Sequence, residues 1–387
     1  MKKIIKVLLV TIFMNIFLVM TPMAKELDNN TSDLEQNSNV QELYDYVTKM
    51  KSESELMNEL NVGNYIKTYI TQGKGDISTK ELSKALLSAV FKEARGVLQL
   101  LISIIVIAIL CSLLRNLQDA FKGSHGDIAF YACYAILIII ISKSFLITID
   151  LAKTTIQNLT DFMMALIPVL VFMIGSVGGI TEAVTMDPIL MGAVTIAPRV
   201  YVDFIIPMIL MSFVLNFVNN LSNDHKITNI CKLFKQVTLW VQGILVTILI
   251  GLLTIRGITS TAIDAVTLKT AKFAVDNFIP IVGKAFSDAI ASVAGYAVLL
   301  KNAISSLGLL VVIFIVLIPI IKLIMITVMY KLSAALVEPI CDSRITNCIA
   351  SVGDFVVMII SCMLSISLMF FVMIAIMAST GKFVVGG

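Results

Sequence analysis

Long apolar runs without a charged residue are the feature that most constrains this chain. Residues 97–114 and 355–378 hold no charged side chain at all. A helix needs about 20 apolar residues to cross the hydrocarbon core of a bilayer. Only 14% of the chain is charged and 58% is hydrophobic, whereas an ordinary soluble domain carries about 25% charged residues. We therefore predict an all-α, polytopic membrane protein.

Further apolar stretches follow the first one and are separated by short polar segments. Their number predicts a membrane domain over residues 97–387 with about 6–8 helical spans. The expected spans are residues 97–114, 128–149, 162–180, 201–218, 237–255, 285–300, 304–330 and 355–378.

Two stretches, residues 175–199 and 281–301, are apolar but rich in glycine, proline and charged residues. Irregular backbone at membrane depth is tolerated only where protein or a water-filled cavity surrounds it. We therefore expect broken or re-entrant helices there, and a further break at Pro319 and Lys322 within the 304–330 stretch. The predicted helix-break residues are Gly175, Gly179, Pro188, Pro280, Gly283, Gly295 and Pro319.

A possible internal repeat brackets these two stretches. An Ile-Pro pair at 167–168 is followed by another at 206–207, and the pair at 279–280 is followed by one at 318–319. Repeats with interrupted helices in corresponding positions are typical of transporter sites. Because isoleucine and proline are common in spans and little else aligns, coincidence is an equal explanation.

The chain begins with a signal-like segment. Lys2, Lys3 and Lys6 precede an apolar run that ends near residue 20, as in a secretory signal peptide. Residues 1–24 are therefore a signal peptide or a signal anchor, and either one sends the next segment outside. Residues 25–96 are polar and predict an extracytoplasmic helical segment, which either lies on the membrane and its own core or docks a partner.

Charged residues inside or beside apolar runs are costly, so each is expected to have a structural or functional role. Arg199 and Asp203 are four residues apart and can pair on one helix face. The others are lysines that reach the interface with their long side chains, or groups that line a polar pathway. The candidate pathway residues are Lys143, Asp187, Arg199, Asp203, Asp288, Lys301, Lys322 and Glu338.

No pattern in the chain predicts catalysis. A complete phosphate-binding loop is missing, the six cysteines do not form a C-x-x-C pair, and only two histidines occur. We therefore expect no enzyme activity, cofactor or metal, and the net charge of +3 gives no reason to expect nucleic acid as a partner. Any energy for transport must come from a gradient or from a partner protein.

Positive charge does not fix the topology. Residues 219–236 and 256–284 are both net basic and flank one expected span, yet basic loops favour the cytoplasmic side. A re-entrant hairpin at 175–199 would place the first loop, residues 219–236, on the cytoplasmic side. The two basic loops still cannot both be cytoplasmic if the span between them crosses the membrane fully. The topology stays open at this stage.

The carboxyl half resembles a known family. The segments DAVTLKTAKFAVDNFIPIVGKAFSDAIASVAGYAVLLKNAISSLGL at 264–308 and PIIKLIMITVMYKLSAALVEPICDSRI at 319–345 are similar to the stage III sporulation protein AE family. The resemblance implies a multi-pass subunit of a secretion or channel complex in the mother-cell membrane around the forespore. It also implies partners: the other stage III sporulation A-operon proteins, including a cytoplasmic ATPase, and stage II sporulation protein Q across the intermembrane space.

Two other functions stay open beside this one. A self-sufficient secondary transporter predicts solute uptake that depends on Asp187, Arg199 or Lys322. A membrane scaffold predicts that the polar residues only hold helices together, so that Lys322→Met leaves sporulation intact. Membrane lipid surrounds the protein in all three cases.

Overall fold

A computed structural model describes residues 47–48, 65–66, 68–69, 79–121, 126–176, 179–221, 227–278 and 283–379. This part of the chain is helical, as predicted, and forms six rods that are long and apolar enough to cross a membrane. One rod consists of α7, the π-helix η1 and α8 in direct succession. The elements are α5 (Thr79–Phe121), α6 (Gly126–Ser176), α7 (Ile180–Val200), η1 (Tyr201–Ile205), α8 (Ile206–Leu221), α9 (Thr228–Phe278), α10 (Gly283–Val337) and α11 (Ser343–Ser379).

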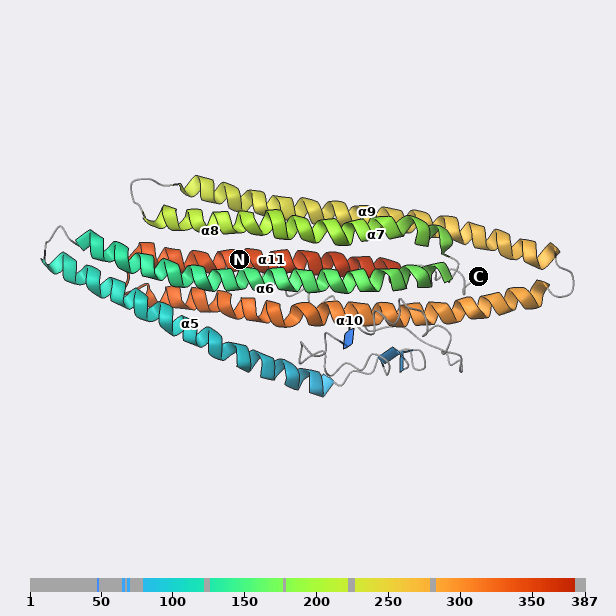
Figure 1. Ribbon diagram of the computed structural model, residues 1–387, viewed down its shortest axis with the longest axis horizontal. Coiled ribbons are helices and arrows are strands. Elements are labelled where there is room, and N and C mark those ends of the chain that lie inside the picture. The colour runs from blue at the N-terminus through green and yellow to red at the C-terminus, as the bar shows by residue number, and fades with distance from the viewer. Residues whose placement is uncertain are drawn as a thin grey trace.

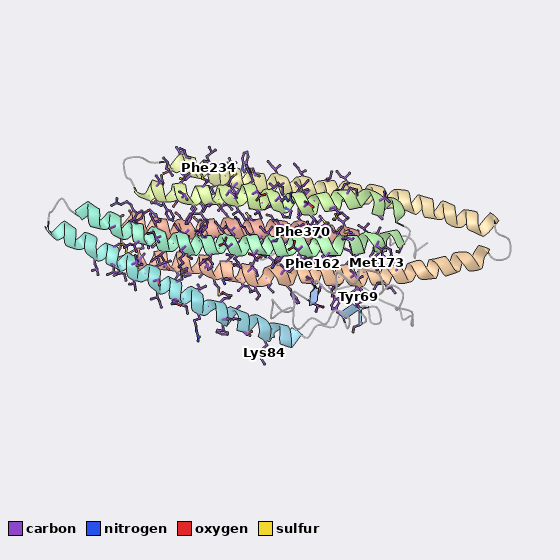
Figure 2. The ribbon with its side chains drawn as sticks, viewed as in Figure 1. Tyr69, Lys84, Phe162, Met173, Phe234 and Phe370 are labelled. Atoms are coloured by element: carbon purple, nitrogen blue, oxygen red, sulfur yellow. The ribbon has the colours of Figure 1, made fainter. Side chains whose placement is uncertain are left out.

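The rods lie side by side along the long axis of the molecule (Figure 1). The rod of α7, η1 and α8 runs with α9 along one edge, α6 and α11 occupy the middle, and α10 and then α5 follow toward the other edge. The interior between the rods is apolar: Phe162 and Met173 of α6 and Phe370 of α11 are fully buried (Figure 2). Burial of such side chains against neighbouring helices stabilises the bundle through close packing, which is the main attraction between helices in lipid.

The eight expected spans are found in fewer helices. Residues 128–149 and 162–180 were expected as two spans, but most of both belongs to α6, which is 51 residues long. The polar segment between them stays helical because Asp150 and Lys153 lie exposed on the surface. In addition, the hydroxyls of Thr155 and Thr160 donate to the carbonyl oxygens of Leu151 and Ile156 at 2.7 and 2.8 Å. The expected spans 285–300 and 304–330 are likewise joined in α10.

Two of the predicted break residues, Gly175 and Gly179, lie where α6 ends and α7 begins. Gly175 lies in the last turn of α6, and Gly179 is the N-cap of α7. A Cβ at Gly179 would lie 2.7 Å from Cγ2 of Ile174, so this tight turn requires glycine.

Three of the other predicted break residues require a correction. Pro188 lies inside α7, and Gly295 and Pro319 lie inside α10, so none of these three ends a helix. Gly283 is the first residue of α10, and Pro280 lies outside the described residues. A proline inside a membrane helix is tolerated because neighbouring groups satisfy the carbonyl that loses its partner.

The π-helix η1 has a local cause in the sequence. Pro207 lies two residues after its end and has no N–H to offer the carbonyl of Asp203, four residues earlier. The proline ring also clashes with that carbonyl in a regular α-helix, and a wider turn relieves the clash. The backbone N–H of Ile206 accordingly donates to the carbonyl oxygen of Tyr201, five residues earlier.

The possible internal repeat is not seen in the fold. The Ile-Pro pairs at 167–168 and 206–207 lie on opposite sides of the α6–α7 turn. In the second unit, residues 283–319 form one uninterrupted helix. The two units therefore have different structures.

The second basic segment is largely part of α9, which continues past the expected span 237–255 to Phe278. Lys269 and Lys272 lie about 21–26 Å beyond residue 255, at 1.5 Å per residue. Arg256 directly follows that span, so basic residues still flank it on both sides and the topology stays open.

Little of the amino-terminal region lies among the described residues. The predicted signal at 1–24 and most of the segment 25–96 are outside them. Val47, Tyr65 and Ile66 are buried against the bundle, and the hydroxyls of Tyr65 and Ser306 of α10 form a hydrogen bond of 2.9 Å. Burial raises the pKa of Tyr65, and the bond to Ser306 opposes that rise. Residues 79–96 belong to α5, so this end of the polar segment is continuous with the first span.

Candidate functional site: charged and polar groups within the helical bundle

The structure distributes the candidate pathway residues over several surfaces. Lys143 of α6, Arg199 of α7, Asp203 of η1 and Glu338 after α10 are exposed. Arg199 and Asp203 do not form the ion pair that their spacing suggested; among described residues neither is within 4.0 Å of an opposite charge. The side chains of Asp187 and Asp288 lie outside the described part. The candidates whose side chains are described do not converge on one pathway.

Lys301 differs from the exposed candidates because its side chain is fully buried. Its Nζ donates to the carbonyl oxygen of Ala378 at 3.1 Å, in the last turn of α11. The last carbonyls of a helix lack intrahelical donors and carry partial negative charge, so a cation is stabilised there. Lys301 thus ties α10 to the end of α11.

Lys322 has a specific partner on another helix. Its Nζ lies 2.8 Å from Oε2 of Glu93 in α5, and both side chains are about 30% exposed (30% and 28%). The pair neutralises two charges at the surface between α5 and α10, which is the arrangement that membrane helices require of ionisable groups. This contact is consistent with a structural role for Lys322, one of the two alternatives that its sequence position left open.

A second charged cluster was not predicted as a site. Nζ of Lys331 in α10 lies 2.8 Å from Oδ1 of Asp354 in α11, and Nζ of Lys235 in α9 lies 3.9 Å from Oδ2. Gly353 leaves space for the lysine stem, because a Cβ there would lie 3.2 Å from Cγ of Lys331. The sequence signal for this cluster was Asp354 itself, an acidic residue directly before the last apolar run.

Polar side chains also meet inside the bundle beside η1. Nε2 of Gln242 in α9 donates to Sγ of Cys362 in α11 at 2.6 Å, and Oγ of Ser361 donates to Oε1 of Gln242 at 3.1 Å. Tyr201 of η1 is fully buried nearby and faces Ser365 and Cys362. Buried hydrogen bonds of this kind fix the register of neighbouring helices.

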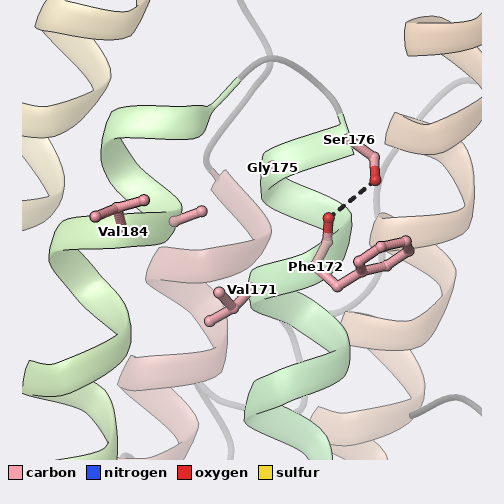
Figure 3. A pocket seen from close by; sticks show the side chains of 6 residues that line it. Val171, Phe172, Gly175, Ser176 and Val184 are labelled. Atoms are coloured by element: carbon pink, nitrogen blue, oxygen red, sulfur yellow. Dashed lines mark hydrogen bonds between the residues drawn. The ribbon is translucent and has the colours of Figure 1, made fainter. Parts of the chain in front are cut away.

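An apolar pocket lies beside the α6–α7 turn (Figure 3). Its volume is about 620 Å³. The Oγ of Ser176, which lines the pocket, donates to the carbonyl oxygen of Phe172 at 3.0 Å, so this hydroxyl hydrogen is already used within α6. Of the predicted residues only Gly175 lines it. The lining residues are Val171, Phe172, Gly175, Ser176, Ala183 and Val184.

Comparison with known proteins assigns the family. Residues 60–381 match the family model of stage III sporulation protein AE. The chain belongs to the stage III sporulation protein AE family. The protein of that name from Bacillus subtilis (strain 168) is 31% identical over 311 residues, which are 80% of this chain and 78% of the relative. No solved structure matches the chain. The resemblance inferred from residues 264–345 is thereby confirmed.

Proposed function

We propose that this chain is a multi-pass membrane subunit of a sporulation channel or secretion complex that links mother cell and forespore and that forespore development requires. Family membership over most of the chain carries the proposal. The six apolar rods support the membrane location, and the mother-cell membrane around the forespore is the proposed site of action.

The distribution of polar groups favours a subunit of a complex over a self-sufficient transporter. Lys322 is paired with Glu93, and Lys301 is bonded to the end of α11, so both contribute to helix packing. The remaining described candidates are exposed on different helices. A transporter of ions or solutes needs such groups to converge on a common site.

The proposed partners are the other stage III sporulation A-operon proteins, including a cytoplasmic ATPase, and stage II sporulation protein Q across the intermembrane space. The ATPase supplies the energy source that the sequence of this chain does not contain. The polar segment at 25–96 is the proposed contact region for partners outside the membrane.

The proposal is tested by purifying the tagged chain from sporulating cells in a mild detergent and identifying the bound proteins. Recovery of the operon products, and their loss when residues 25–78 are removed, supports the proposal. A chain that is recovered alone and that moves a solute into liposomes unaided would refute it and favour the transporter. Forespore development in a strain with Lys322→Met separates the scaffold role from a pathway role.

A further inference from the structure

The outward side of α6 becomes polar in the middle of the helix. Asp150, Lys153, Thr154 and Gln157 are exposed there, and Asp161 is half-buried. These residues are three or four positions apart, so they lie on one side of the helix. We call this set the α6 polar face; it is about 16 Å long at 1.5 Å per residue. None of its members was among the predicted pathway residues.

The charges of the α6 polar face have no opposite charge beside them. Within the part of the chain that the structure describes, neither Asp150 nor Lys153 lies within 4.0 Å of one. Asp161 accepts a hydrogen bond of 2.8 Å from Nε2 of Gln157, which adds no positive charge. A lysine can reach the membrane surface along its stem, whereas an aspartate is too short to do so. Exposure of these carboxylates to lipid is therefore costly.

Contacts with α11 fix the height of the α6 polar face in the bundle. The rings of Phe145 in α6 and Phe355 in α11 are 6.5 Å apart. Further along, a Cβ at Gly308 would lie within 4 Å of both Leu166 in α6 and Ile374 in α11. The helices α6 and α11 therefore run in the same direction, and the α6 polar face lies beside the part of α11 between these two contacts.

The helix α9 is lipid-facing at the same height. Gln242 of α9 bonds to Cys362 of α11 at 2.6 Å, in this same part of α11. Around Gln242, α9 exposes Trp240, Ile244 and Ile248 at 65%, 56% and 61%, all four positions apart. These side chains belong to the charge-free span 237–255, so lipid accounts for their exposure. This height of the bundle thus lies within the bilayer.

The α6 polar face and the apolar side of α9 lie on different sides of the bundle. α11 packs against both α6 and α9 and lies between them (Figure 1). At one depth in the membrane the bundle therefore presents an apolar side and a polar side. Ionisable groups on membrane helices face the protein interior or a water-filled cavity. Because the α6 polar face is exposed on the outside of the bundle, water is the surrounding that suits it.

We propose that the α6 polar face borders a water-filled space within the membrane and forms the wall that this chain contributes to an aqueous pathway for ions and polar solutes. The charged groups stay hydrated there, whereas lipid would remove that hydration at a high cost. The pathway rests on the proposed function, since other subunits of the channel or secretion complex must close the space. The apolar side of α9 faces the lipid around the complex.

Thiol labelling in membranes from sporulating cells tests this proposal. Thr154→Cys places a thiol within the α6 polar face and leaves all its charges in place, and Ile244→Cys is the matched control at the same height on α9. The probe is a cationic, membrane-impermeant methanethiosulfonate added to opened membranes, and mass spectrometry of the labelled peptide gives the rate. We expect Thr154→Cys to react at least about tenfold faster, because only the thiolate reacts and it forms in water rather than in lipid.

A second pair of variants gives an independent measurement. Ile244→Lys should lower the amount of protein found in the membrane, because its charge meets hydrocarbon, while Thr154→Lys should leave this amount unchanged because its charge meets water. An equal loss for both variants would overturn the proposal. Labelling after denaturation in detergent shows that both cysteine variants carry a reactive thiol.

Each labelling result has a defined meaning. Fast labelling of both thiols would show that this height lies outside the bilayer, and slow labelling of both would show that lipid or protein covers the α6 polar face; either result overturns the proposal. Labelling of Thr154→Cys in the purified chain but not in sporulating membranes would show that a partner protein covers the face, and would also overturn it. These rates do not depend on which proteins copurify with the chain, so this proposal and the proposed function can fail separately.

Discussion

Gly308 of α10 offers a direct test of how tightly the three central helices pack. A Cβ at this position would lie 2.7 Å from Cδ2 of Leu166 in α6 and 3.6 Å from Cδ1 of Ile374 in α11. Leu166 and Ile374 are both fully buried. A single methyl group therefore cannot be added here without displacing Leu166.

The expected magnitude follows from two opposing effects. Alanine is favoured over glycine inside a helix by about 1 kcal/mol, while overpacking of a filled core costs about 1–3 kcal/mol. Gly308→Ala should therefore lower the free energy of unfolding by up to about 2 kcal/mol. Gly251→Ala in α9 is the matched control, because a Cβ there has nothing within 4 Å, and it should gain up to about 1 kcal/mol.

Thermal unfolding of the purified variants in one detergent, at one scan rate, measures the order of stability. Gly251→Ala should melt at or above the temperature of the natural chain, and Gly308→Ala below it. Combining Gly308→Ala with Leu166→Ala should cost less than the sum of the two single changes, because the smaller side chain removes the clash. A Gly308→Ala variant as stable as Gly251→Ala would refute the packing of α6, α10 and α11 described above.

Three further predictions concern the polar contacts. Lys322→Met should lower the unfolding temperature, because Glu93 is left without its partner at a cost of about 1 kcal/mol. The double variant Lys322→Met with Glu93→Gln should recover most of the loss. Equal stability of all variants would contradict a structural role for the pair. Gln242→Leu should destabilise the chain by about 1–2 kcal/mol in thermal unfolding, because two buried hydrogen bonds are lost, and an unchanged midpoint would count against that cluster. A maleimide should modify the partly exposed Cys231 before the fully buried Cys362 in the folded protein. Mass spectrometry of the labelled peptides measures the order, and earlier labelling of Cys362 would contradict its burial.

The sequence predicts the class of the fold well, because the hydrocarbon core imposes a simple rule on composition. Charge-free runs such as residues 97–114 and 355–378 are found within α5 and α11. The number of rods was less predictable. Hydropathy divides residues 128–180 at Asp150 and Lys153, yet a helix continues through such residues when their side chains project from its surface.

The polar contacts were only partly predictable, since spacing along a chain does not reveal the partner on another helix. The sequence marked Lys322 as a costly charge within an apolar run. It could not identify the ion-pair partner, Glu93, which is 229 positions away along the chain. Arg199 and Asp203 were correctly spaced for a pair and yet both stay exposed, with the start of η1 between them. Glycines were informative where they allow close approach, as at the α6–α7 turn, and Gly308 was overlooked because it interrupts no apolar run.

The length of α6 has a consequence for biogenesis. A membrane-insertion machine that samples about 20 residues at a time meets two acceptable spans in this one helix, on either side of Asp150 and Lys153. Each presents itself for insertion before α10 and α11 have been synthesised. The contacts of α6 with α10 and α11 can therefore form only after these later helices have emerged.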